Sequence, residues 1–155
     1  MPGKRAIEFQ FAKERKQRAP NVPLSQIRRV KTGYLGLLNG MKIWLVDGEL
    51  VRRFMDIDWT MGSHDAHSAF IPMHEIWVSK LLSPSDLAPL LVHEAVEREW
   101  MVKRGWSYEK SHDRASLLET TLRKKIHRYK VATREQAMHI AREMTAEFLK
   151  KDLRH

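Results

Sequence analysis

Two histidines and two glutamates interrupt the apolar faces of two predicted helices in the second half of the chain. In the stretch LLVHEAVEREWM, residues 90–101, His93 and Glu97 are four positions apart. On an α-helix this spacing leaves them about 40° apart, on the same side as Leu90 and Trp100. Because burying an unpaired carboxylate is costly, Glu97 requires a cation, a metal ion or several hydrogen-bond donors as its partner.

The next predicted helix shows the same pattern. Its core-facing stripe runs from Tyr108 to Ile126 and is interrupted by His112 and Glu119. A short connection joins the two helices, so we expect them to pack antiparallel and to bring the four polar side chains into one volume. The chain has no cysteine, so its metal ligands would be His, Asp and Glu, and we expect a divalent ion, most simply zinc. The predicted ligands are His93, Glu97, His112 and Glu119.

A polar segment upstream of these helices could extend the ligand set. In GSHDAH, residues 62–67, the side chains of His64, Asp65 and His67 belong to a predicted loop that could reach the site. A structural alternative stays open. His93 bonded to Glu119, together with His112 bonded to Glu97, would satisfy all four side chains without a metal.

Turn and cap signals predict the elements that position these residues. Asp47-Gly48 lies between two apolar runs and predicts a hairpin with strands at 41–46 and 49–55. The polar segment 56–70 is expected to be a loop, and HEIWVSK, residues 74–80, a third strand.

Three helices are predicted after the third strand. The first follows Ser83 or Ser85 and ends at Gly105, where glycine tolerates the left-handed conformation that terminates helices. Ser107 can cap the second, which runs to about Tyr129, and TREQ at 133–136 is a capping box for the third, which ends near Leu153. The predicted fold class is α+β, with a small antiparallel sheet, made of the hairpin and the third strand, packed on three C-terminal helices.

Positive charge is concentrated at the N-terminus. The chain has a formal net charge of +9, and residues 1–31 hold nine basic and two acidic residues. We therefore divide the chain into a basic N-terminal arm, residues 1–31 with a charged helix at 4–18, and a single α+β domain with the His/Glu site, residues 32–155. Such an arm could contact nucleic acid or an acidic partner. The residues predicted for nucleic-acid contact are Arg15, Lys16, Arg18, Arg28 and Arg29.

No apolar run approaches the ~20 residues that a membrane-spanning helix needs. The N-terminal stretch MPGKRAIEF is too charged for a signal peptide. We expect a soluble, cytoplasmic protein without a membrane partner.

At VHEAVE, residues 92–97, the chain resembles the active-site helix of zincin metallopeptidases, whose His-Glu-x-x-His supplies two zinc ligands and a general-base glutamate. The order of a strand, a helix with His-Glu and a further acidic helix also resembles the gluzincin layout, from Glu75 to Glu119. The chain departs from the family at Glu97, which replaces the second histidine and makes the motif HExxE. The resemblance implies a zincin-like core in which His93, Glu97 and His112 bind the metal and Glu94 is the general base, with Glu119 as an alternative or supporting ligand.

A longer part of the chain, from FIPMHEIWVS to the LLE at 117–119, resembles small uncharacterised proteins encoded by phages and bacteria. This resemblance implies no particular activity. It favours the cytoplasm of a bacterium or of a phage-infected host.

From these observations we expect a metal-dependent, peptidase-like hydrolase that acts on a peptide or another small substrate. Glu94 would take a proton from water, and Tyr108 or His64 would stabilise the oxyanion. The alternative is a phage or bacterial module that binds nucleic acid or protein through the basic arm and LRKKIHRYK, residues 122–130. In that case the His/Glu cluster is structural.

Overall fold

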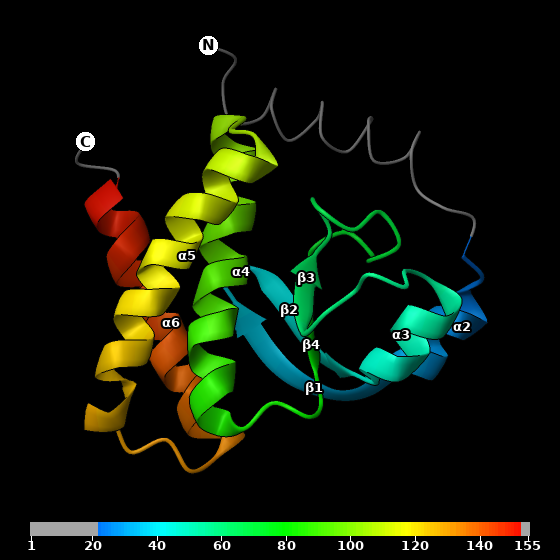
Figure 1. The fold of residues 1–155 in the computed structure, drawn as a ribbon, viewed down its shortest axis with the longest axis horizontal. Helices are drawn as coiled ribbons and strands as arrows, with labels where there is room; N and C mark the ends of the chain where they lie inside the picture. Colours follow the sequence, from blue (N-terminus) through cyan, green and yellow to red (C-terminus); the bar gives the residue numbers. More distant parts are fainter. Residues whose placement is uncertain (1–21, 153–155) are drawn as a thin grey trace.

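A four-stranded sheet lies between two groups of helices in the computed structural model, which describes residues 22–152 (Figure 1). The strands are β1 (Lys31–Leu38), β2 (Met41–Val46), β3 (Gly62–His64) and β4 (Glu75–Ser79). The helices are α2 (Leu24–Val30), α3 (Gly48–Phe54), α4 (Pro84–Arg104), α5 (Tyr108–Lys125) and α6 (Arg134–Asp152), and η1 (Ile126–Arg128) is a 3-10 turn after α5. The predicted α+β class is confirmed.

The sheet is mixed, so the prediction of an antiparallel sheet was wrong in this respect. The strand order is β1-β2-β4-β3, in which β2 and β4 are parallel and the two outer pairs are antiparallel. In the central pair Ile43 lies opposite Ile76, and Leu45 opposite Val78. Parallel strands require a crossover. Here the chain passes from β2 through α3 and β3 before it enters β4.

The predicted hairpin at Asp47-Gly48 is wrong. The Asp47 side chain accepts hydrogen bonds from the backbone N–H groups of Glu49 at 3.1 Å and Leu50 at 3.3 Å, so Asp47 is the N-cap of α3. Residues 49–55, predicted as a strand, therefore belong mostly to a helix. Aspartate followed by glycine is as suitable for starting a helix as for turning a hairpin, and the N-cap prevails here.

The hairpin lies one strand earlier, between β1 and β2. Asn39 and Gly40 make its turn with φ angles of 49° and 78°. Positive φ at both central residues is the requirement of a type I′ turn, for which Asn-Gly is the preferred sequence.

The third predicted strand is confirmed as β4, but the segment predicted as a loop at 56–70 also contains β3. This strand pairs antiparallel with β4 and lies at the edge of the sheet. Its sequence, Gly-Ser-His, has no β-branched or apolar residue, so propensity gave no sign of it. His64 is consequently held on a strand.

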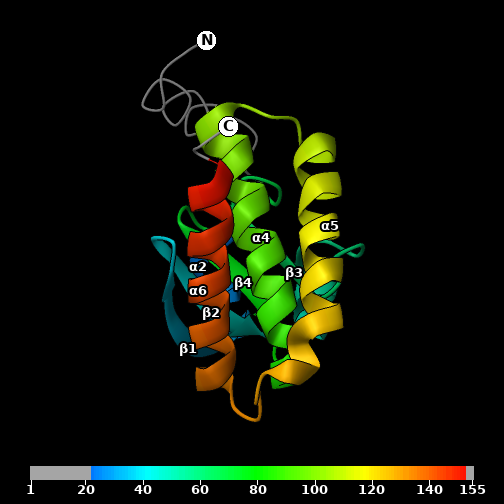
Figure 2. The same ribbon diagram turned by 90° about the vertical axis from the view of Figure 1, so that its left-hand side faces the viewer.

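Different elements cover the two faces of the sheet. On β4, Ile76 and Val78 pack in the cluster that includes residues of α4, α5 and α6, whereas Trp77 packs with Val30 of α2 and Val51 of α3. Figure 1 shows these two groups of helices on opposite sides of the sheet. Figure 2 shows α4 between α5 and α6, and two of these helices contact the sheet: α4 contacts β3 and β4, and α6 contacts β1.

The three predicted C-terminal helices are confirmed, with their caps. Ser83 accepts a hydrogen bond from the backbone N–H of Asp86, Ser107 does the same for Lys110, and Gly105 ends α4 with a φ of 67°. The second helix ends at Lys125, earlier than predicted, because residues 126–128 tighten into η1.

Part of the predicted basic arm is described. It includes α2, whose Val30 is buried, whereas Arg28 and Arg29 are exposed. Arg15, Lys16, Arg18 and the helix predicted at 4–18 lie outside the described residues. Within residues 22–152, no helix combines the length and the apolar character needed to cross a membrane.

A buried ion pair fastens the segment after β3 to α4. Asp65 accepts hydrogen bonds from Arg98 Nε at 2.9 Å and Nη2 at 3.2 Å, and from the backbone N–H of His74 at 2.7 Å. The two side chains are 0% and 7% exposed. This pair therefore holds the neighbouring His64 against α4.

Asp65→Ala should lower the free energy of unfolding by about 3–5 kcal/mol, because the Arg98 guanidinium would stay buried without this carboxylate. Urea denaturation followed by circular dichroism measures the change. Asp113→Ala, on the exposed side of α5, is the control and should change stability by less than ~0.5 kcal/mol. Equal stability of the two variants would contradict the anchoring role.

Candidate metal centre

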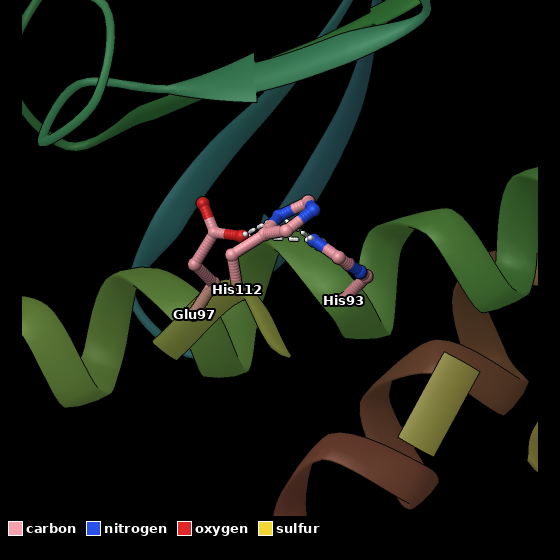
Figure 3. A group of neighbouring side chains, drawn as sticks. All are labelled: His93, Glu97 and His112. Atoms are coloured by element: carbon pink, nitrogen blue, oxygen red, sulfur yellow. Dashed lines mark hydrogen bonds and ion pairs between the residues drawn. The ribbon is translucent and has the colours of Figure 1, made fainter. Parts of the chain in front are cut away.

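Three potential metal ligands meet where α4 faces α5 (Figure 3). Glu97 Oε2 lies 2.8 Å from His93 Nε2 and 2.9 Å from His112 Nδ1, and the two ring nitrogens are 3.2 Å apart. His93 and Glu97 belong to successive turns of α4, and His112 projects from α5. The structure thus brings three of the four predicted ligands to one point, which we call the ligand triangle.

A divalent ion fits this set of donors. Zinc binds imidazole nitrogen and carboxylate oxygen at about 2.0–2.2 Å in tetrahedral sites, which places neighbouring ligand atoms about 3.3 Å apart. The sides of the ligand triangle, 2.8, 2.9 and 3.2 Å, are close to this spacing. Small side-chain rotations would therefore suffice to accommodate the ion.

Glu119, the fourth predicted ligand, contacts the far side of His93. Its Oε1 lies 2.9 Å from His93 Nδ1, and its Oε2 accepts a hydrogen bond from Arg123 Nε at 2.8 Å. A carboxylate behind a metal-binding histidine fixes the orientation of the ring and makes it a stronger ligand. The His93–Glu119 and His112–Glu97 pairs of the structural alternative are both present, so protons could also satisfy this cluster.

His64 holds the other oxygen of Glu97. His64 Nε2 is 2.8 Å from Glu97 Oε1, and the backbone N–H of Ala66 donates to His64 Nδ1 at 3.2 Å. Because Nδ1 accepts a hydrogen bond, the proton of the neutral ring belongs on Nε2, where it is donated to Glu97. Ligand atoms of His64, Glu94 and Glu97 also lie within 4.8 Å of one another. This tautomer, however, makes His64 a donor to the carboxylate and favours the ligand triangle as the metal-binding group.

The charges of the ligand triangle follow from its contacts. Burial raises the pKa of Glu97, but hydrogen bonds from His64 and His93 outweigh burial and hold this pKa far below its ordinary value. Burial lowers the pKa of His93, but the Glu119 and Glu97 carboxylates outweigh it and raise the pKa to about 10. At neutral pH His93 is therefore an imidazolium, and an ion that binds its Nε2 must displace a proton.

Glu94 is placed differently from Glu97, although both are on α4. It lines the cleft beside the ligand triangle, is 6% exposed, and accepts no hydrogen bond from a described residue. Burial raises its pKa to about 7, against the opposing effect of His64. A carboxyl group that titrates near neutral pH is suited to taking up and returning a proton.

A cleft of about 360 Å³ opens onto the ligand triangle. Tyr108 lines it, with its hydroxyl 3.4 Å from His112 Nδ1. Burial and the carboxylates of Glu97 and Glu94 raise the pKa of Tyr108 to about 12, so its hydroxyl keeps its proton and can donate a hydrogen bond. Of the two predicted oxyanion donors, His64 is fully buried behind Glu97, and Tyr108 faces the cleft.

The remaining predicted ligands have other contacts. The His67 ring stacks on Tyr108 with 3.9 Å between ring centres, and burial together with His64 lowers the pKa of His67. Asp65 is held by Arg98, as described above. Neither residue belongs to the ligand triangle.

Three residues near the centre escaped the sequence analysis. Arg123, which holds Glu119, could have been found from its position four residues later on the same helix. Asp56 and Asp58 line the cleft from the segment between α3 and β3. No local pattern marks them, because only the path of this segment brings them to the cleft.

Comparisons of the chain with protein-family models, curated proteins and solved structures find no match. We therefore infer the function from the geometry of the centre. This geometry defines a small α+β domain with a His/Glu centre where two helices and an edge strand meet.

The protein should bind a zinc ion, and His93→Ala should weaken this binding by about 100-fold or more, because it removes one corner of the ligand triangle. Competition with a chromophoric chelator measures the affinity. His139→Ala is the matched control, since His139 is 71% exposed on α6. Zinc affinity that is the same in both variants would rule out the triangle as the site.

Zinc affinity should rise by about tenfold for each pH unit between pH 6 and 8. The reason is that the pKa of His93, about 10, lies above this range, so binding must release its proton throughout. Calorimetry in buffers of different ionisation enthalpy counts the protons released. Binding without proton release would show that the ion does not bind His93 Nε2.

Proposed function

We propose that the protein is a metal-dependent hydrolase, peptidase-like in its chemistry and related in its centre to the zincins. The observation that carries the proposal is the placement of Glu94, a buried carboxyl without a hydrogen-bond partner among the described residues, in the same cleft as the ligand triangle. A metal site and a proton acceptor that open to one cleft are the two components that metal-assisted hydrolysis requires. The likeness of VHEAVE to the zincin helix supports the same roles.

The proposed roles rest on the residues that line the cleft. His93 Nε2, His112 Nδ1 and Glu97 Oε2 would hold the ion, which we propose to be zinc. When bound, the ion supplies Lewis acidity, which acidifies water and polarises a carbonyl or phosphoryl group. Glu94 accepts the proton of the attacking water on its carboxylate and returns it to the leaving group. Tyr108 donates a hydrogen bond to the substrate oxygen that gains negative charge.

Glu97 makes the centre more negative than one with a second histidine at this position. Extra negative charge on the ligands reduces the ability of an ion to acidify water. The hydrogen bond from His64 to Glu97 Oε1 at 2.8 Å offsets part of this charge. His64 therefore supports the reaction by holding and partly neutralising the ligand, and it need not touch the substrate.

The alternative function concerns a different surface. Arg28 and Arg29 on α2, and Lys124 and Lys125 at the end of α5, are exposed and do not line the cleft. As a nucleic-acid-binding or protein-interaction module, the protein would use these cations, and nucleic-acid binding would weaken with salt. Variants of the cleft and of the basic residues would separate the two functions.

Glu94→Gln should lower kcat for zinc-dependent hydrolysis by about 100-fold or more, because the amide cannot accept the proton. A fluorogenic peptide library, assayed with the zinc-loaded protein, supplies the substrate. Zinc affinity should stay within a few-fold, since Glu94 is outside the ligand triangle.

Glu99→Gln is the control for this experiment. Glu99 is also on α4, but it accepts a hydrogen bond from Asn39 and does not line the cleft. Its variant should keep the wild-type kcat. Wild-type protein that binds zinc but hydrolyses none of the library, or Glu94→Gln with full activity, would overturn the proposal.

A further inference from the structure

The cleft is acidic, although the chain as a whole has a net charge of +9. Five carboxylates line the cleft, and no lysine or arginine does. Three of them, Glu94, Glu97 and Glu119, belong to the centre or contact it. The other two, Asp56 and Asp58, lie outside the centre, and we call them the acidic pair.

The acidic pair has no cationic partner among residues 22–152. Asp56 Oδ1 accepts a hydrogen bond from the backbone N–H of Asp58 at 3.0 Å, and the structure gives neither carboxylate an ion pair. Arg52, the nearby arginine of α3, donates instead to the carbonyl oxygens of Trp59 and Thr60. The negative charge of Asp56 favours the protonated form of His67, whose ring stacks on Tyr108, although burial lowers the pKa of His67 overall. The acidic pair therefore lines the same cleft as Tyr108, the proposed oxyanion donor.

Glu94 independently indicates that the cleft holds a ligand. The residue is 6% exposed, and its side chain lines the cleft without a hydrogen-bond partner among the described residues. A buried carboxyl in this position can accept a hydrogen bond from a group that enters the cleft.

Apolar side chains line the cleft together with the acidic pair. They are Trp59, Met61 and Leu90, of which Met61 is 39% exposed. Lysine and arginine have an apolar stem and a cationic head, so one such side chain could cover the apolar atoms and reach the carboxylates. The volume of about 360 Å³ is at the lower end of the range for small-ligand sites.

We infer that the cleft selects peptides with a lysine or arginine side chain next to the bond presented to the ligand triangle, and that Asp56 and Asp58 bind its cationic head. The cleavage of that bond rests on the proposed function. Recognition of the cation does not, because it depends on the acidic pair and not on turnover. Complementary charge would also draw basic peptides to this cleft and away from the basic remainder of the surface.

Ligand-observed NMR with the zinc-loaded protein tests the recognition step. The probes are acetyl-arginine amide and acetyl-citrulline amide, which has a neutral urea in place of the guanidinium. The arginine probe should bind about tenfold more tightly or better, the range expected for charge-assisted hydrogen bonds. Its binding should weaken with salt. Equal binding of the two probes would overturn the inference.

Two double variants with the same change in charge locate the recognition. Asp56→Asn with Asp58→Asn should abolish the preference for the arginine probe. Glu109→Gln with Asp113→Asn, both exposed on α5 and outside the cleft, should retain it. An arginine preference that survives in the first double variant, or is lost in the second, would contradict the assignment.

Three further results test this inference, and two of them separate it from the proposed function. Binding of alanine amide, which carries only a free amino terminus, without binding of acetyl-arginine amide would overturn the side-chain assignment. Zinc-dependent hydrolysis of neutral peptides in preference to basic ones would leave the proposed hydrolase standing and overturn the inference. Selective arginine binding without hydrolysis of any peptide would support the inference and contradict the proposed function.

Discussion

The burial of the Glu97 carboxylate is the constraint on which the centre depends. A carboxylate on a residue only 2% exposed can remain ionised only if its surroundings compensate the charge, and three imidazoles do so. They come from α4, from α5 and from the edge strand β3, so one carboxylate links two consecutive helices to a strand whose His64 is 33 residues away in sequence. The same compensation leaves its second oxygen and two ring nitrogens directed at a common point. The contacts that stabilise buried Glu97 are therefore the same contacts that form the candidate metal site.

Two glutamates three residues apart on α4 acquire opposite properties from their surroundings. Glu97 faces histidine donors that hold its pKa far below the ordinary value, whereas burial without a donor raises the pKa of Glu94 to about 7. The first is suited to binding a cation and the second to exchanging a proton. Pairs of like groups whose environments separate their pKa values are a frequent basis for dividing ligand and acid-base roles. Here one helix supplies both, and the packing around each side chain decides which role it takes.

The helical part of the fold was predictable because its signals are local. Ser83, Gly105 and Ser107 mark the helix ends, and the interruptions of two apolar stripes pointed to His93, Glu97 and His112 before any contact was known. The sheet was less predictable, since Asp47 can cap a helix as well as turn a hairpin, and β3 consists of residues that do not favour strands. The pairing of His93 with Glu119 was one predicted alternative, but which ring nitrogen of His93 faces Glu119, and the tautomer of His64, depend on side-chain directions that spacing alone does not define. The sequence pattern therefore located the His/Glu cluster, but the contacts of the folded chain were needed to assign a role to each of its residues.

The helix α5 packs mainly on α4, whereas α4 contacts β3 and β4 as well as both neighbouring helices. His112 is thus mounted on the less anchored member of the pair, while His93 and Glu97 are mounted on the best supported one. An ion held between them would be a reversible cross-link between α4 and α5. Loss of such an ion would weaken the attachment of the outer helix first, so resistance to proteolysis would depend on the concentration of the metal.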